Sequence, residues 1–234
     1  MMTLHNQIQR MIKMTSEIKI EKKASEVIQP ESVNEARQAL QAKKDLSGAN
    51  LEGLQLDNLH ATGAIFRKTN LKNANLSHGL LISPNFYKTN ATGAAVDRTV
   101  IVNGDLVKAC FAEADLSESA LVGANAEEAD FHGANLRQAG LFGTNLCNAN
   151  LTNANLANSR FAGVNVTGAD FSGADMSRAK AYQVNWEQAK VPPEPLPEGF
   201  IQLPKWAWSA ILGSFLGILG VIVYAILRRK SANS

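Results

Sequence analysis

The sequence predicts an all-β solenoid, and three regularities of its middle part carry that prediction. Every fifth residue from Leu46 to Trp186 is apolar, which gives 29 such positions without a slip of phase. The residue two places before each of them is nearly always small, and the residue directly before is often Asn or Asp. A period of five fits neither a strand nor an α-helix, so the chain must turn the same small corner repeatedly.

We call each of these 29 apolar residues a centre. Many centres lie in the words ANL, ADL, ADF or ADM, as in Ala49-Asn50-Leu51. These words resemble the A(D/N)LXX signature of the pentapeptide-repeat family, and the resemblance covers residues 46–186. It implies a right-handed quadrilateral β-helix, with one pentapeptide on each of the four sides of a coil.

The pattern of side-chain sizes supports such a β-helix independently. Alternate residues of an extended segment point the same way, so a centre and its small partner both point inward. At four pentapeptides per coil, the 29 centres give about seven coils, stacked ~4.8 Å apart. The small centres Ala91 and Ala126 adjoin the large centres Phe86 and Phe131 in the repeat, and we expect each Phe to fill the space beside its neighbour.

The two ends of a solenoid expose unpaired backbone and need caps. Ser32 and Glu35 have the spacing of a helix-start capping box, and Trp186 and Val191 are expected to close the last coil. The predicted organisation is a polar, partly disordered segment (1–30), a cap helix (31–44), the repeat β-helix (45–190), a Pro-rich linker (191–204) and a transmembrane helix with a basic flank (205–230).

Residues 206–227 predict a single-pass transmembrane helix. These 22 residues carry no charge, and at ~1.5 Å per residue they extend about 33 Å, enough to cross a ~30 Å hydrocarbon core. Ser209, Gly213 and Gly217 recur at every fourth residue. Small residues at this spacing predict close contact with another membrane helix.

Two arguments about the orientation in the membrane oppose each other. Residues 1–30 contain no secretory signal, so we expect the repeat domain on the cytoplasmic side of a C-terminal anchor. The three basic residues at 228–230 favour the opposite orientation. The family resemblance is also compatible with a thylakoid location.

One side of the predicted coil differs from the other three, because none of its centres follows an Asn or Asp. The outward columns of this side contain the apolar residues Leu80, Ile82, Val100, Val102, Val122 and Phe142. An exposed apolar patch usually marks an interface, so we interpret these residues as a face for a protein partner or for self-association. Two alternatives are that residues 1–30 fold back over the face, and that β-branched residues merely suit a flat strand.

A second outward column is basic. Lys68, Lys88 and Lys108 are spaced by twenty residues and are expected to stack, with Arg67 beside them. Like charges ~5 Å apart repel, so this ladder suggests anionic lipid or an acidic partner. The plainer interpretation is a solvated basic edge that ends at Glu128.

Residue types that carry chemistry do not gather in the sequence. The four histidines have no Cys, Asp or Glu at metal-ligand spacing, and Cys110 and Cys147 are expected to be free thiols. We therefore predict no enzyme, metal, cofactor or small-molecule substrate. Residues 45–190 have eleven Lys/Arg and fourteen Asp/Glu, a net charge of −3, which argues against a nucleic-acid partner.

The sequence thus predicts a membrane-anchored scaffold that presents a rigid β-helical rod to a protein partner in a larger membrane complex. Two functions found in the resembled family are kept as alternatives. One is a secreted effector that attaches to host membranes. The other is a topoisomerase-protection protein that imitates DNA, which would need a strongly acidic surface.

Overall fold

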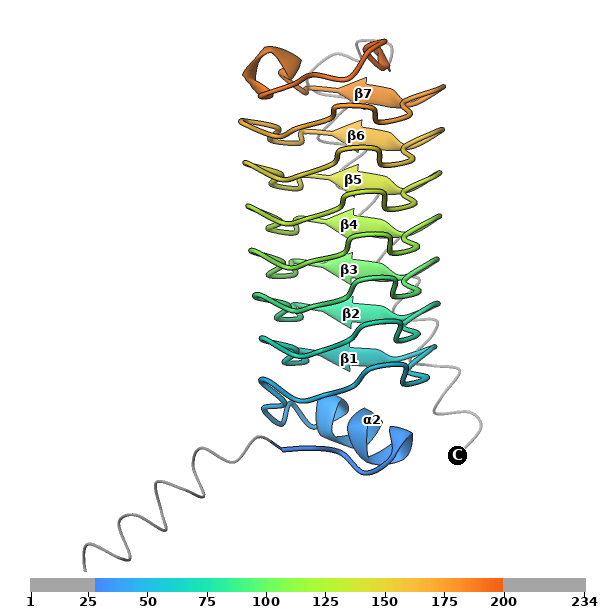
Figure 1. Ribbon diagram of the computed structural model, residues 1–234, viewed down its shortest axis with the longest axis vertical. Coiled ribbons are helices and arrows are strands. Elements are labelled where there is room, and N and C mark those ends of the chain that lie inside the picture. The colour runs from blue at the N-terminus through green and yellow to red at the C-terminus, as the bar shows by residue number, and fades with distance from the viewer. Residues whose placement is uncertain (1–27, 200–234) are drawn as a thin grey trace, which may run out of the picture. The chain divides into compact units, whose positions relative to one another are not determined.

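The computed structural model describes residues 28–199, and the part up to Glu198 belongs to one compact unit. The chain forms a short helix and then winds as a stack of similar turns (Figure 1). Its elements are α2 (Val33–Gln41), β1 (His60–Thr62), β2 (Leu80–Ile82), β3 (Val100–Val102), β4 (Ala120–Val122), β5 (Gly140–Phe142), β6 (Arg160–Ala162), β7 (Lys180–Tyr182), the 3-10 helix η1 (Trp186–Gln188) and β8 (Glu198–Gly199).

Several predictions fall outside these residues. They concern most of the segment 1–30, the end of the linker, and the transmembrane helix with Ser209, Gly213 and Gly217. Within residues 28–199, no helix has the length and apolar character needed to cross a membrane.

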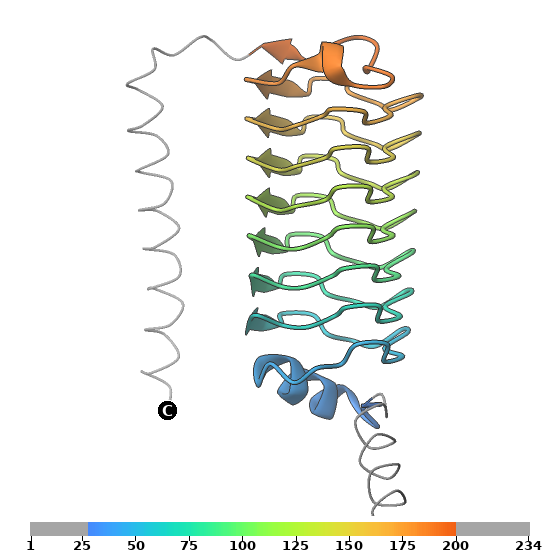
Figure 2. The ribbon, with the colours of Figure 1, turned by 90° about the vertical axis from the view of Figure 1, so that its left-hand side faces the viewer.

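The strands form one sheet in which β1 to β8 follow one another in chain order, and β1 to β7 pair in parallel. Each step from β1 to β7 advances the chain by twenty residues, so that Leu81 lies opposite Ile101 and Ile101 opposite Leu121. The strands are all on one side of the stack (Figure 2). The other three sides are turns joined by single parallel bridges, such as the one between Asn125 and Asn145. Each turn of the solenoid therefore contains four pentapeptides, as predicted.

The solenoid has about six turns, and the expectation of seven was too high. At the start, α2 lies where the cap helix was predicted, and the first strand of the sheet is β1, fourteen residues after Leu46. At the end, Trp186 begins a 3-10 helix instead of another pentapeptide. The final bridge joins Asp170 to Val191, one residue more than the regular spacing, so the phase of the repeat is lost there.

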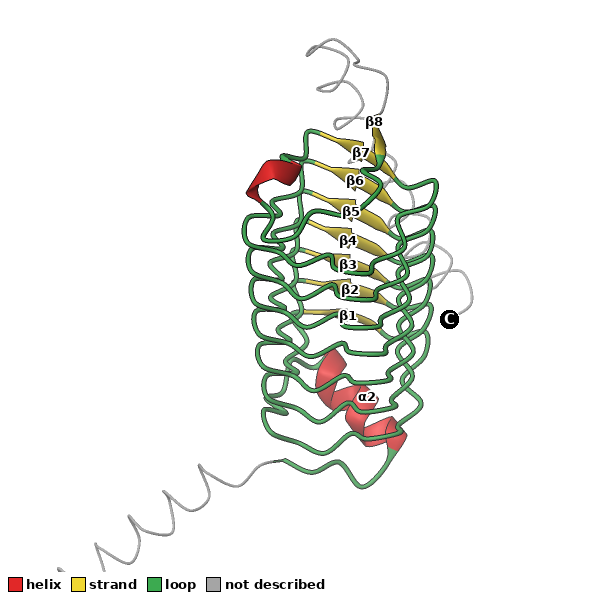
Figure 3. Cartoon of the chain, turned by 45° about the horizontal axis from the view of Figure 1, so that its top comes forward, coloured by secondary structure: helices red, strands yellow, loops and turns green. Residues whose placement is uncertain are grey.

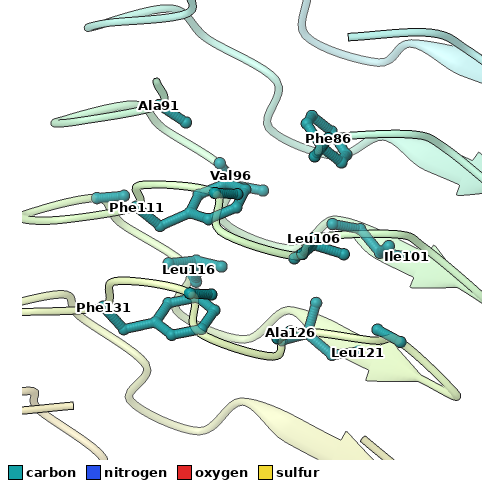
Figure 4. Packing of buried hydrophobic residues seen from close by; sticks show 14 of the residues in the cluster. Phe86, Ala91, Val96, Ile101, Leu106, Phe111, Leu116, Leu121, Ala126 and Phe131 are labelled. Atoms are coloured by element: carbon teal, nitrogen blue, oxygen red, sulfur yellow. The ribbon is translucent and has the colours of Figure 1, made fainter. Parts of the chain in front are cut away.

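The centres fill the interior of the solenoid, and all of them from Leu46 to Ala181 are buried. Phe66 stacks on Phe86, with ring centroids 4.6 Å apart. Phe86 meets the edge of Phe111 at 5.9 Å, so the aromatic column changes sides of the turn at this point. It does so next to Ala91, a small centre of the same turn as Phe86 (Figure 4). This exchange of large and small centres agrees with the predicted sharing of volume.

Outward Asn and Asp residues bind both the corner of their own turn and the neighbouring turn. The Oδ1 of Asn145 accepts hydrogen bonds from the backbone N–H of Cys147 (3.1 Å) and from Nδ2 of Asn165 (2.9 Å). Its own Nδ2 donates to Oδ1 of Asn125 at 2.9 Å. The bond to the corner was expected from the sequence, whereas the bond between turns was not.

Both ends of the solenoid are capped (Figure 3). Ser32 Oγ accepts a hydrogen bond from the backbone N–H of Glu35 at 3.2 Å, which confirms the predicted start of the cap helix. Arg37 of α2 donates to the backbone carbonyl of Asp57 at 2.7 Å and so joins the helix to the first turn. At the other end, Trp186 packs edge-on against Phe161, with centroids 5.5 Å apart.

Candidate protein interface on the strand side

The six apolar residues singled out in the sequence come together on the strand side. Their backbones pair from strand to strand: Leu80 with Val100, Ile82 with Val102, Val102 with Val122, and Val122 with Phe142. All six are half-buried, while the residue between each outward pair is buried in the core. We call the set Leu80, Ile82, Val100, Val102, Val122 and Phe142 the outer sheet face.

The outer sheet face is flatter at β4 and β5 than at β2 and β3. One of its two columns continues there with Ala120 and Gly140, which add little or no side chain. The ring of Phe142 lies over Gly140, since a Cβ built on this glycine would be 2.5 Å from the ring atom Cε2. Glycine is needed at 140 for this close approach, a role that the five-residue period alone did not reveal.

The two edges of the outer sheet face differ in charge. The turn that follows each strand from β2 to β6 begins with an uncharged residue: Ser83, Asn103, Gly123, Gly143 and Gly163. On the other edge, Arg98 forms an ion pair with Glu118 at 3.2 Å. The hydrogen bond to Glu118 raises the pKa of Arg98 above its ordinary value. Beyond β5 the columns become basic, with exposed Arg160 in β6.

The basic ladder of Lys68, Lys88 and Lys108 also forms, on an adjacent side. Each lysine has a left-handed backbone conformation at a corner, with φ between 55° and 58°. Lys108 is 3.3 Å from Glu128, which ends the ladder as the plainer interpretation expected. Lys88 lies 5.3 Å from the ring centroid of Tyr87.

Tyr87 is a part of the basic ladder that sequence reasoning missed. Arg67 lies over the same ring, also 5.3 Å from its centroid. Each cation is attracted to the electron-rich face of the ring. The signal was visible in the sequence, because Tyr87 is twenty residues after Arg67 and directly before Lys88.

The described residues offer little for metal or thiol chemistry. Between residues 28 and 199, no group of three or more His, Cys, Asp or Glu side chains is placed to hold a metal ion. Cys110 and Cys147 are free thiols, both half-buried. Cys110 takes the place of an Asn in its column, with Sγ 3.3 Å from Thr92 Oγ1.

Stacked turns of four pentapeptides around a filled core define a class of protein, the parallel β-solenoids. The family model described as pentapeptide repeats matches residues 45–81, 109–146 and 139–178 in eight copies, and the chain belongs to the pentapeptide-repeat family. No curated protein matches the sequence.

Several solved structures are similar to this chain. QnrB1, a plasmid-mediated fluoroquinolone resistance protein, is 22% identical over 73% of this chain and 94% of its own, with a TM-score of 0.46. HetL, involved in heterocyst differentiation regulation in the cyanobacterium Nostoc sp. strain PCC 7120, is 21% identical over 65% of this chain and 86% of its own, with a TM-score of 0.22. A pentapeptide repeat protein from the Arabidopsis thaliana thylakoid lumen is 26% identical over 49% of this chain and 70% of its own, with a TM-score of 0.17. These similarities carry no conclusion about function.

Proposed function

We propose that this chain is a membrane-anchored, non-enzymatic scaffold whose outer sheet face binds a protein partner. The observation that carries the proposal is the placement of six apolar outward residues on the side with regular strands. Buried centres occupy the interior of the solenoid, which favours binding on the outer surface over chemistry inside. We also infer a right-handed winding, because connections between parallel strands of one sheet are right-handed in about 98% of cases.

The membrane anchor in this proposal is residues 206–227. Their length and lack of charge support a span, and in this proposal the solenoid lies on the cytoplasmic side. Ser209, Gly213 and Gly217 would contact a second membrane helix. A thylakoid membrane is one location that fits this arrangement.

Membrane flotation tests the anchor directly. Full-length protein and a chain ending at residue 204 would be mixed with lipid vesicles, washed with alkaline carbonate and centrifuged through a density gradient. The full-length protein is expected to float and the shortened chain to stay at the bottom, although both keep the solenoid. A full-length protein that stays at the bottom contradicts the anchor. Digestion of the solenoid by protease added outside sealed cells contradicts the cytoplasmic orientation.

The two alternative functions lack a supporting observation of their own. Imitation of DNA calls for a strongly acidic surface, whereas residues 45–190 have a net charge of only −3. Attachment to host membranes as a secreted effector would use the same apolar segment. Appearance of the protein in the culture medium would favour the effector over the scaffold.

A further inference from the structure

We propose that Asn103 is a site of spontaneous deamidation. The backbone nitrogen of Gly104 attacks the side-chain amide of Asn103 and leaves aspartate or isoaspartate at the corner after β3. This inference goes beyond the proposed function and depends neither on the membrane anchor nor on a protein partner. Three observations carry it, namely the sequence at this corner, the hydrogen bonding of its backbone and the exposure of its side chain.

The sequence at this corner differs from that at every similar one. Asn103 and Gly104 form the one Asn-Gly step of the whole sequence. A Cβ on the following residue hinders the approach of its nitrogen to the asparagine side chain, and glycine has none. Packing requires glycine at 104, since a Cβ there would be 2.7 Å from Cγ2 of Ile101. The other asparagines with a left-handed backbone at a corner are followed by Leu, Ala or Ser: Asn58, Asn73, Asn148, Asn153 and Asn158.

The peptide group between Asn103 and Gly104 is unbonded at both ends. Among residues 28–199, the carbonyl of Asn103 accepts no hydrogen bond and the N–H of Gly104 donates none. At the corner of Asn148, by contrast, the N–H of Ala149 donates to the carbonyl of Leu146 at 3.0 Å. The attacking nitrogen has to turn toward the side chain, so a hydrogen bond of this kind must first break. At Gly104 no such bond has to break.

A proline one turn earlier supports this difference between the corners. Pro84 is twenty residues before Gly104, in the same column, and proline has no N–H to donate. The turns still stack in register there, because the carbonyl of Pro84 accepts a hydrogen bond from the N–H of Asp105 at 2.9 Å. The fold therefore does not use an N–H at this point of the turn.

The side chain of Asn103 is exposed, and within the described part of the chain it makes no hydrogen bond. Its Oδ1 lies beside Gly123 of the next turn, at 2.5 Å from a Cβ built on that glycine. Asn145 on a turn side, in contrast, takes part in three hydrogen bonds through its amide. The amide nitrogen of Asn103 can therefore leave without losing a protein partner, and water can reach the site.

The reaction balances with water as the co-reactant. The Gly104 nitrogen forms a bond to Cγ of Asn103 and gives up its proton, while the bond from Cγ to Nδ2 breaks and ammonia leaves. Water then opens the cyclic imide. Opening at Cγ gives aspartate, and opening at the backbone carbonyl carbon of residue 103 gives isoaspartate. Base promotes the first step because it removes the proton of the attacking nitrogen.

Isoaspartate at 103 should strain the stacking of this corner. Its main chain passes through the side-chain carbons and so gains an atom between residues 103 and 104. The N–H of Asn103 donates to the carbonyl of Val122, and the N–H of Asn125 donates to the carbonyl of Gly104, both at 2.8 Å. The extra atom changes the spacing of these two bonds. The new carboxylate also follows Val102 directly, on the edge of the outer sheet face that otherwise carries no charge.

Ageing of the full-length protein in mild detergent at mildly alkaline pH tests the proposal. Peptide mass spectrometry follows the exchange of amide for carboxyl, and a protein isoaspartate methyltransferase identifies the isomer. Ala149→Gly is the matched control, because it creates a second Asn-Gly step whose N–H keeps its bond to Leu146. We expect Asn103 to react roughly tenfold faster than Asn148 in this variant, because a backbone hydrogen bond must break only at the latter. Ala154→Gly repeats the comparison at Asn153, where the corresponding bond to Leu151 is 3.1 Å.

Unfolding in urea shows whether the fold causes the difference. The natural and the engineered Asn-Gly steps should react at similar rates in urea, because no backbone hydrogen bond then holds either of them. Equal rates in the folded variants would overturn the proposal, and so would a difference that persists in urea. Circular dichroism would show that Ala149→Gly and Ala154→Gly are folded.

Two substitutions at 103 test the consequence of the modification. Asn103→Asp carries the charge of the product without the extra main-chain atom, so the aged wild type should melt at a lower temperature than this variant. Asn103→Gln should keep its melting temperature on ageing, because glutamine closes the corresponding ring far more slowly. Glutamine suits the corner, since Gln183 in the same column has the same φ of 51°. Converted wild type that melts like the fresh protein would contradict the expected strain.

Discussion

The strand side and the three turn sides of the solenoid use their outward residues differently. On the turn sides, an Asn such as Asn145 binds its own corner and both neighbouring turns. On the strand side, the corresponding positions hold residues such as Val100 and Ala120, whose side chains make no hydrogen bonds. Polar outward residues on the turn sides therefore serve stability through their side-chain hydrogen bonds, whereas Val100 and Ala120 on the strand side contribute none.

Backbone pairing accounts for this difference. In a regular parallel strand, backbone N–H and C=O groups pair with the neighbouring strands, so no side chain has to satisfy them. At the turn sides only a single bridge forms, and the N–H two residues on is bound by the Asn or Asp oxygen instead. The N–H of Glu127, which binds Asn125 Oδ1 at 3.3 Å, is an example.

Removing an aromatic centre should have the largest effect on stability, because the strand side and the three turn sides pack on the same core. Phe111 stacks on Phe131 at 5.6 Å and meets the edge of Phe86. Phe111→Ala is expected to lower the free energy of unfolding by about 3–5 kcal/mol, the usual cost of such a cavity. Urea denaturation measures it. A loss below about 1 kcal/mol would contradict a core shared by all four sides.

Two glycine substitutions separate corner strain from contact between turns. Gly123 and Gly143 both have left-handed backbones, with φ of 61° and 59°, so alanine at either should cost about 1–2 kcal/mol. At Gly123 the added Cβ would also lie 2.5 Å from Oδ1 of Asn103, whereas at Gly143 nothing lies within 4 Å. Thermal unfolding should show a clearly larger loss for Gly123→Ala. Equal losses would mean that Asn103 moves aside freely.

One substitution on a turn side and one on the strand side, each changing the polarity of an outward side chain, sharpen the comparison. Asn145→Ala removes three hydrogen bonds and should lower the free energy of unfolding by about 1–2 kcal/mol. Val122→Thr keeps the strand and changes only an outward methyl group, so its effect should stay within about 0.5 kcal/mol. The same urea experiment compares them. A larger loss of unfolding free energy in Val122→Thr than in Asn145→Ala would contradict the claim that outward polar residues of the turn sides contribute more to stability than outward residues of the strand side.

The smallest expected effect is a dependence on pH at the last turn. Hydrogen bonds from Ser172 and Lys190 lower the pKa of Asp170 from 3.8 to about 2, and Lys190 Nζ is 3.0 Å from its carboxylate. Because the folded pKa is depressed, this stabilisation is present above pH about 4 and is lost as the pH falls through about 2. Asp170→Asn should flatten the melting temperature between these values. An unchanged pH profile in the variant would exclude Asp170 as its source.

Much of the fold was predictable because one rule repeats. A buried centre every five residues predicted the outward position of Val102 and the left-handed corner at Gly123, and the family resemblance implied four pentapeptides per turn. The end of the solenoid was less predictable, since Trp186 obeys the pattern of centres yet begins a 3-10 helix. The five-residue period alone does not show which turn is the last one of the solenoid.

The sequence predicted which residues of the candidate interface align from turn to turn, but not the contacts between their side chains. The sequence placed Val100 and Val102 side by side, because twenty-residue spacing sets both columns. It did not show that Phe142 lies over Gly140, or that Arg67 and Lys88 share the ring of Tyr87. Such contacts depend on side-chain rotamers between turns, which periodicity does not determine.

The size of the native assembly extracted from membranes tests most directly whether the strand side is the binding side. Full-length wild type, Val102→Lys and Val107→Lys would be extracted in mild detergent and compared by native gel electrophoresis. We expect the wild type and Val107→Lys to migrate in the same large assembly, and Val102→Lys to migrate as the free chain. An assembly that survives Val102→Lys, or that is lost equally in Val107→Lys, would contradict the claim.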